Sequence, residues 1–363
     1  MAESDWFAGK AGDHSGFLSN KRRQHMQFHR KASAFGASLL LFLATFAGEC
    51  ASAEPAKVML NMGSTASPVH SYSQAADLFE EMVKKNSNGA IETKRMFGGV
   101  LGSETKMTTS VQDGSLEMGW LSDIGMSTVL PEIGFVNLPY LFPTYDDVDK
   151  LYLNGWMGEI VKKRLEAKGI HVLAWIENDY RGFTNSRRRI LKSEDFKGLK
   201  VRVPEMPMFV NFFKELGVLP TPMSITEVAT ALQQGTVDGQ DNGAILTQDF
   251  GFSKFQKYAT KTKHSYSAGA IMINKKLWDG LSPERKKILQ DAATSAGAQQ
   301  IKANRARVEG NYQLMKADGM QIDDVTPEVH ARMKAAALKI WSDKSITQKY
   351  GDDVLSRLLG TAK

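Results

Sequence analysis

The sequence predicts an α/β protein built from two lobes. Strand-like and helix-like segments alternate in two stretches of the chain, which is typical of sheets covered by helices. The length of 363 residues is more than one small hydrophobic core normally serves. Hydrophobic residues make up 42% of the chain and charged residues 24%, which is ordinary for a globular protein and excludes disorder and a polytopic membrane protein.

The first 53 residues carry the pattern of a secretory signal peptide. Basic clusters precede an apolar run over residues 32–48, and Ala51-Ser52-Ala53 forms a small-x-small cleavage site. We expect cleavage near Ala53 and export to the periplasm. An uncleaved membrane anchor is the alternative, but the apolar run is shorter than the roughly 20 residues a span needs. The basic region is long for a leader, so Met26 competes with Met1 as the true start.

The chain after this leader begins with a strand, a helix and a second strand. Residues 58–63 read as the first strand, followed by a loop. A helix is expected next, with Ser67 at its N-cap and Pro68 at its first position, ending before Gly89. A strand over residues 90–97 follows, and glycines open the loop before a second helix.

The same alternation returns in the middle of the chain. Strands are expected at residues 171–176 and 200–204, with a helix from about 208 to 216. Ser224 and Glu227 have the spacing of a capping box with Ser224 at the N-cap of a helix, and Gly235 has that of the glycine after the helix end. Near the C-terminus, an alanine-rich and charged segment from Pro283 to about residue 318 predicts a helix of roughly 36 residues, or about 54 Å, long enough to lie across both lobes.

Most motifs for catalysis, metals and cofactors are absent. After residue 53 the histidines are His70, His171, His264 and His330, and none has metal-ligand spacing. No nucleophile elbow, P-loop or dinucleotide-binding glycine motif is present, and the single cysteine excludes a disulfide scaffold. The sequence therefore predicts no metal, no cofactor and no catalytic residue. The formal charge of +6 is too mild and too scattered to indicate nucleic-acid binding.

Cationic residues lie at the ends of two predicted strands. Arg181 comes directly after one strand, and Arg202 alternates with Val201 and Val203 in another. The face that carries Arg202 is either exposed to solvent or lines a cleft. In a cleft, an arginine is suited to an anion, because its planar fork donates two parallel hydrogen bonds to a carboxylate.

Several ordered motifs resemble the extracytoplasmic solute-binding proteins of tripartite ATP-independent periplasmic (TRAP) transporters, of the dicarboxylate-binding type. The resemblance covers essentially the whole chain after the leader. The motifs are KGLKVRVP at 197–204, LG at 216–217, PTP at 220–222, ALQQGTVDGQDN at 231–242, FGGVLGSE at 97–104, LPYLF at 138–142 and RGFTN at 181–185.

The resemblance implies a fold in which two α/β lobes close on a ligand by a hinge, a Venus-flytrap arrangement with a long helix contacting both lobes. We expect lobe I to comprise residues 54–178 and about 267–306, and lobe II residues 179–266 and about 307–363. In this family the central arginine binds a substrate carboxylate. The positions that match its ligand-binding residues are Arg202, Asn242 and Arg181, with Glu104 and His70 in loops that reach the distal part of the ligand.

The implied function is a periplasmic receptor that captures a small organic acid, performs no chemistry and docks on integral membrane subunits of a TRAP transporter. A sugar acid, a C4-dicarboxylate and a keto acid each offer the required carboxylate. The alternatives are a secreted enzyme using His70 and Glu104 as acid and base, and a receptor for a sensor or an ATP-driven transporter. We expect a monomer.

The sequence departs from the family pattern at a few positions near these motifs. Asp179 replaces an expected glycine, Asp241 a glutamate, Gly243 a proline and Ala229 a tyrosine. These changes bear on the identity of the acid and the shape of the cleft wall, and they leave the arginine that binds the carboxylate in place.

Overall fold

The computed structural model describes residues 57–361, which belong to one compact unit. The predicted leader, its cleavage site near Ala53 and the choice between Met1 and Met26 lie outside the described residues. Within residues 57–361, no helix combines the length and the apolar character that a membrane crossing requires.

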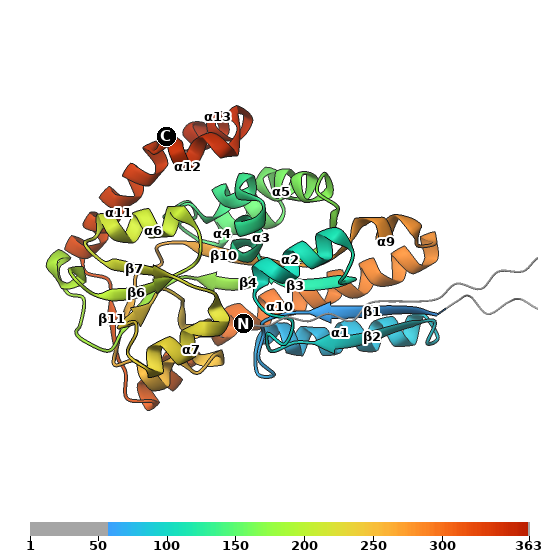
Figure 1. Ribbon diagram of the computed structural model, residues 1–363, viewed down its shortest axis with the longest axis horizontal. Helices are drawn as coiled ribbons and strands as arrows, with labels where there is room; N and C mark the ends of the chain where they lie inside the picture. The colour runs from blue at the N-terminus through green and yellow to red at the C-terminus, as the bar shows by residue number, and fades with distance from the viewer. Residues whose placement is uncertain (1–56, 362–363) are drawn as a thin grey trace, which may run out of the picture. The chain divides into compact units, whose positions relative to one another are not determined.

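The described residues form two mixed sheets (Figure 1). In the first, β1 pairs in parallel with β2 and β3, while β10 is antiparallel to β3 and β4. Parallel neighbours need crossover connections, and helices follow β1 and β2 in the chain. The strands, in spatial order, are β2 (Ile91–Met96), β1 (Val58–Gly63), β3 (Met118–Ser122), β10 (Tyr266–Asn274) and β4 (Ile170–Tyr180).

The second sheet contains β5 to β9, which lie between β4 and β10 in the chain, and β11. In it β6 is parallel to β7 and β8, and β5 is antiparallel to β8 and β9. The strands, in spatial order, are β11 (Gln321–Asp324), β9 (Tyr258–Lys261), β5 (Phe183–Asn185), β8 (Gly239–Gln240), β6 (Lys200–Val203) and β7 (Leu219–Pro222).

Helices accompany both sheets. The helices of the first part are α1 (Ser71–Asn86), α2 (Glu104–Asp113), α3 (Asp123–Val129), α4 (Tyr145–Asp147) and α5 (Trp156–Glu166). Those that follow are α6 (Pro207–Glu215), α7 (Ile225–Gln233), α8 (Ala244–Asp249), α9 (Lys275–Gly280), α10 (Pro283–Ala317), α11 (Pro327–Ser342), α12 (Lys344–Thr347) and α13 (Asp352–Thr361). As expected, Ser224 is the N-cap of α7 and Gly235 follows the helix with a φ of 68°, but the Ser224 hydroxyl accepts from the Thr226 N–H and not, as the predicted capping box requires, from that of Glu227.

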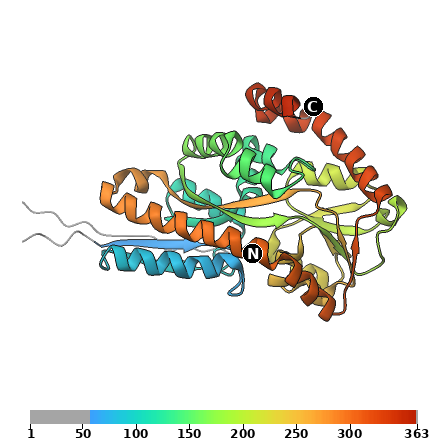
Figure 2. The same cartoon turned by 180° about the vertical axis from the view of Figure 1, so that it is seen from behind.

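The chain passes between the two sheets more than once. It leaves the first sheet from β4 to β5, returns from β9 to β10, and leaves again through α10 towards β11. The α10 helix has 35 residues. It contacts β4 of the first sheet and β11 of the second, and it also contacts α1 and α8. Figure 2 shows it running along the back of the molecule. The predicted long helix and its contact with both lobes are therefore confirmed.

The close packing of α10 on β4 depends on small residues. Ala292, Ala293, Ala296 and Gly297 are buried on the helix. A β-carbon at Gly297 would lie 2.5 Å from the carbonyl oxygen of Trp175, closer than real contacts allow. Glycine at this position is what lets the helix backbone approach the strand.

The start of α1 differs from the prediction. The N-cap is His70 and not Ser67, because the chain first makes a turn in which the His70 N–H donates to the Ser67 carbonyl at 3.1 Å. The His70 Nδ1 then accepts from the Tyr72 N–H at 3.1 Å. The Ser67 hydroxyl instead donates to the carbonyl oxygen of Asp249 at 2.9 Å, at the end of α8.

Candidate ligand-binding site

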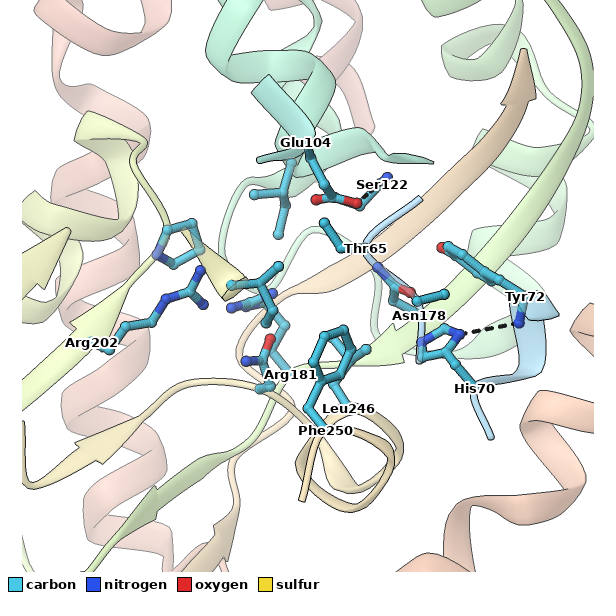
Figure 3. A pocket seen from close by; sticks show the side chains of 15 residues that line it. Thr65, His70, Tyr72, Glu104, Ser122, Asn178, Arg181, Arg202, Leu246 and Phe250 are labelled. Carbon is cyan, nitrogen blue, oxygen red and sulfur yellow. Dashed lines mark hydrogen bonds between the residues drawn. The ribbon is translucent and has the colours of Figure 1, made fainter. Parts of the chain in front are cut away.

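A buried cavity brings together all the predicted site residues (Figure 3). Arg202 comes from β6, Asn242 follows β8, and Arg181 follows β4. Glu104 begins α2, and His70 caps α1. The cavity is thus lined from strands of both sheets and from the helices that follow β1 and β2.

Arg202 is held in place along one edge of its guanidinium group. Its Nε and Nη2 donate to the Met223 carbonyl oxygen at 3.0 and 2.9 Å. Its Nη1 lies 3.8 Å from Oδ1 of Asp241, beyond hydrogen-bond distance. Burial lowers the pKa of Arg202 to about 10, so the group is still a cation at neutral pH. The side chain is therefore positioned and charged, with Nη1 outside these hydrogen bonds.

Arg181 is engaged by a carboxylate of the protein itself. Its Nε and Nη2 donate to Oδ2 and Oδ1 of Asp241 at 3.1 and 2.7 Å, and both side chains are buried. The guanidinium carbon lies 5.1 Å from the centre of the Phe209 ring. Burial alone would raise the pKa of Asp241, but Arg181 and its other partners hold it at about 2. Arg181 therefore lines the cavity with its charge already balanced.

Asn242 presents a donor without a partner. Its backbone N–H donates to Oε1 of Gln240 at 2.6 Å, which fixes the main chain. Its side-chain Nδ2 is fully buried and has no hydrogen-bond partner. Buried donors are almost always satisfied, because an unmade hydrogen bond costs the full desolvation of the group. The arrangement is suited to a ligand oxygen beside Asn242.

Glu104 is tied to the start of α3. Its Oε1 accepts from the Ser122 N–H at 3.0 Å, and its Oε2 accepts from the Ser122 hydroxyl at 2.6 Å. Burial raises the pKa of Glu104, and the bonds from Ser122 oppose that rise. Gly125 makes room for this carboxyl group, since a β-carbon there would lie 2.5 Å from the Glu104 β-carbon.

His70 is a neutral imidazole. Burial, helped by the charge of Arg307, lowers its pKa to about 3. Because Nδ1 accepts from the Tyr72 N–H, the ring proton sits on Nε2. His70 therefore offers a hydrogen-bond donor that carries no charge.

The cavity also contains residues that the sequence did not single out. They include Tyr72 on the buried face of α1 and Asn178 in β4. The other lining residues are Thr65, Ala66, Ser122, Ile124, Pro204, Ile225, Leu246 and Phe250. A signal for Asn178 was present, because Glu177-Asn178-Asp179 is a polar run at the end of a strand, the same pattern that pointed to Arg181. Among residues 57–361, no group of three or more histidine, cysteine or acidic side chains is arranged so that it could hold a metal ion.

Comparison with known proteins supplies the family. The model of the bacterial extracellular solute-binding proteins, family 7, matches residues 62–348. The 2,3-diketo-L-gulonate-binding periplasmic protein YiaO of Escherichia coli is 32% identical over 282 residues, which are 78% of this chain and 85% of that protein.

Solved structures agree in fold. A TRAP periplasmic solute-binding protein from Polaromonas sp. JS666 bound to D-erythronate is 32% identical, with a TM-score of 0.77 over 83% of this chain and 98% of that one. The sugar acid binding protein DctPAm from Advenella mimigardefordensis, in complex with galactonate, is 30% identical, with a TM-score of 0.79 over 85% and 98% of the two chains. The chain therefore belongs to family 7 of the bacterial extracellular solute-binding proteins, the TRAP periplasmic solute-binding proteins, which bind small organic acids and are not enzymes.

Proposed function

We propose that this protein is exported to the periplasm, captures a small organic acid with Arg202 and Asn242, and delivers it to the membrane subunits of a TRAP transporter. The acid is a sugar acid, a C4-dicarboxylate or a keto acid. The observation that carries the proposal is the pairing of a fixed, buried guanidinium with the unsatisfied amide of Asn242 in one cavity.

The charges favour one ligand carboxylate beside Arg202. Arg181 and Arg202 both lie near Asp241, which forms its hydrogen bonds with Arg181. Two guanidinium cations thus share one protein carboxylate, and a ligand carboxylate compensates the second cation. Charge-assisted hydrogen bonds of this kind are about twice as strong as neutral ones.

Residues from both lobes would contact the ligand. Arg202 and Asn242 belong to the proposed lobe II, residues 179–266 and about 307–363. His70 and Glu104 belong to the proposed lobe I, residues 54–178 and about 267–306. A ligand stabilises the closed form to the extent that it makes contacts there that the open form lacks, so binding would favour closure.

The relatives support an organic acid. D-erythronate and galactonate occupy two solved family members, and a third relative is a diketo-gulonate-binding protein. Each of these compounds carries a carboxylate together with several oxygen groups. Delivery to membrane subunits rests on the family, whose TRAP members serve transport.

The test is thermal unfolding of the protein without residues 1–53 against a panel of organic acids, with neutral sugars and amino acids as controls. A ligand at 100 times its dissociation constant stabilises the native state by about 2.7 kcal/mol, which raises the unfolding midpoint by several degrees. The shift should be confined to acids and lost in Arg202→Ala. Arg189→Ala is the matched control, because Arg189 pairs with Asp323 outside the cavity. A shift produced only by neutral sugars or amino acids would contradict the proposal.

A further inference from the structure

Unsatisfied polar atoms gather on the cavity. Among the described residues that line it, the fully buried polar atoms without a hydrogen-bond partner are Nδ2 of Asn242, the hydroxyl of Tyr72 and Oδ1 of Asn178. In Figure 3, Arg202 lies at one side of the cavity, and Tyr72, Asn178 and His70 lie at the other side. The side remote from Arg202 therefore has its own unmet hydrogen-bonding capacity.

These groups are uncharged and need both donors and acceptors from a ligand. Burial, together with the nearby carboxylates of Glu104, Asp123 and Glu177, raises the pKa of Tyr72 well above its usual value. Its phenol is therefore neutral and can donate or accept. The carboxamide oxygen of Asn178 needs a donor, and the Nε2–H of His70 can donate to a ligand acceptor. A hydroxyl group can meet each of these needs.

The same side of the cavity is unfavourable for a second carboxylate. In the part of the chain that the structure describes, the cations lining the cavity are Arg181 and Arg202, and Arg181 is paired with Asp241. No cation of the lining accompanies Tyr72 and Asn178, whereas the carboxyl group of Glu104 lines the same cavity. Arg307, whose charge reaches His70, is not part of the lining and is paired with Asp249 at 2.7 Å. A carboxylate cannot donate a hydrogen bond to Asn178, and a buried charge without a partner is costly.

We propose that Tyr72 and Asn178, with His70, form a hydroxyl-recognising half of the cavity, and that the ligand is a polyhydroxylated monocarboxylic acid of the sugar-acid class. This inference rests on the proposed function, since Arg202 holds the single carboxylate. It selects sugar acids over dicarboxylates, and over keto acids that lack hydroxyl groups. Selection follows because a site built to hydrogen-bond a hydroxyl group rejects analogues that leave its polar groups unpaired.

The test is calorimetric titration with four-carbon acids that share a carboxylate and differ in the rest: erythronate, succinate, 2-oxobutyrate and butyrate. A six-carbon series of galactonate, adipate and hexanoate covers the case in which the cavity prefers a longer chain. The hydroxylated acid of the better series should bind at least tenfold more tightly than the others. Tyr72→Phe and Asn178→Leu should each weaken it about 3- to 10-fold, as expected for one lost hydrogen bond, and leave the weak binding of the unhydroxylated acids unchanged.

Tyr140→Phe is the matched control, because the Tyr140 hydroxyl is also buried without a partner but Tyr140 does not line the cavity. Tyr140→Phe should leave the affinity for every acid unchanged.

Asn178→Ala replaces Asn178→Leu if the latter does not fold. Equal binding of the dicarboxylate and the hydroxylated acid, both lost in Arg202→Ala, would overturn this inference and leave the proposed function standing. The inference would also be overturned if Tyr72→Phe and the Asn178 variant both bound the hydroxylated acid as tightly as the unmodified protein does. Failure of every acid in both series would instead remove the proposed function, and this inference with it.

Discussion

The carboxylate of Asp241 accepts two hydrogen bonds from Arg181, at 2.7 and 3.1 Å, and this ion pair is buried in the wall of the cavity. The same carboxylate lies 3.8 Å from Nη1 of Arg202. Asp241 therefore balances the charge of Arg181 and lies close to Arg202, the arginine that we propose for the ligand, without forming a hydrogen bond to it.

Asp241→Asn keeps the shape of the side chain and removes its charge. Two buried guanidinium groups then share no carboxylate, and loss of one partner from a buried ion pair typically costs about 3–5 kcal/mol. We expect a fall of that size in the free energy of unfolding, measured with urea at pH 7.

The control for this variant is Asp323→Asn, which breaks the more exposed pair with Arg189. It should cost far less, because solvent screens exposed ion pairs. Equal losses in the two variants would show that burial does not set the strength of the Arg181–Asp241 pair.

The stability contributed by Asp241 should depend on pH at the acidic end. Its pKa of about 2 in the folded protein is below its usual value of 3.8, so the folded state favours the ionised form. The contribution is complete above about pH 4 and is lost as the pH falls through 2. The difference in unfolding free energy between the protein and Asp241→Asn should therefore shrink between pH 4 and pH 2. A difference that stayed constant over this interval would argue against the assigned shift.

Ionisation of Asp179 should destabilise the folded protein as the pH rises, the opposite of the effect expected for Asp241. Burial and the charge of Glu177 raise its pKa to about 7, while an unfolded aspartate ionises near 3.9. Between these values the folded state holds a proton that the unfolded state lacks, so stability falls as the pH rises from about 4 to 7. Asp179→Asn cannot ionise and should raise the unfolding midpoint more at pH 8 than at pH 5. The same gain at both pH values would refute this explanation.

Gly297 should be the residue on which the packing of α10 against β4 depends. Gly297→Ala places a methyl group 2.5 Å from the Trp175 carbonyl oxygen, and overpacking of this kind typically costs about 1–3 kcal/mol. Gly310 lies on the same helix and is exposed, and a β-carbon added there would have no neighbouring atom within 4 Å. Gly310→Ala should therefore stabilise the protein by up to about 1 kcal/mol. Urea unfolding of both variants measures the contrast, and equal effects would contradict it.

Local patterns in the sequence predict much of the fold. The alanine-rich segment ending near residue 318 predicts α10 because composition and caps act within one helix. The alternation of Arg202 with Val201 and Val203 predicts two faces of β6, and both valines are fully buried. These features depend on neighbours in the chain, so one sequence is enough to find them.

The partners of the site residues depend on contacts between distant segments and could not be predicted in this way. Asp241 lies 60 positions from Arg181, and no local pattern pairs them. Tyr72 falls on the apolar face of α1, where helical periodicity cannot distinguish burial in a core from burial beside a cavity. The Ser67 hydroxyl, predicted to cap α1, instead donates to the carbonyl oxygen of Asp249, a contact between distant parts of the chain that no local pattern reveals.

The central claim is that Arg202 binds a ligand carboxylate, and calorimetric titration of erythronate against its neutral amide tests it most directly. The amide keeps the hydroxyl groups and the shape but removes the charge. We predict that the acid binds at least tenfold more tightly than the amide, and that Arg202→Gln, which removes the cation, removes most of this preference. Equal affinity for the acid and the amide, unaffected by Arg202→Gln, would contradict the account.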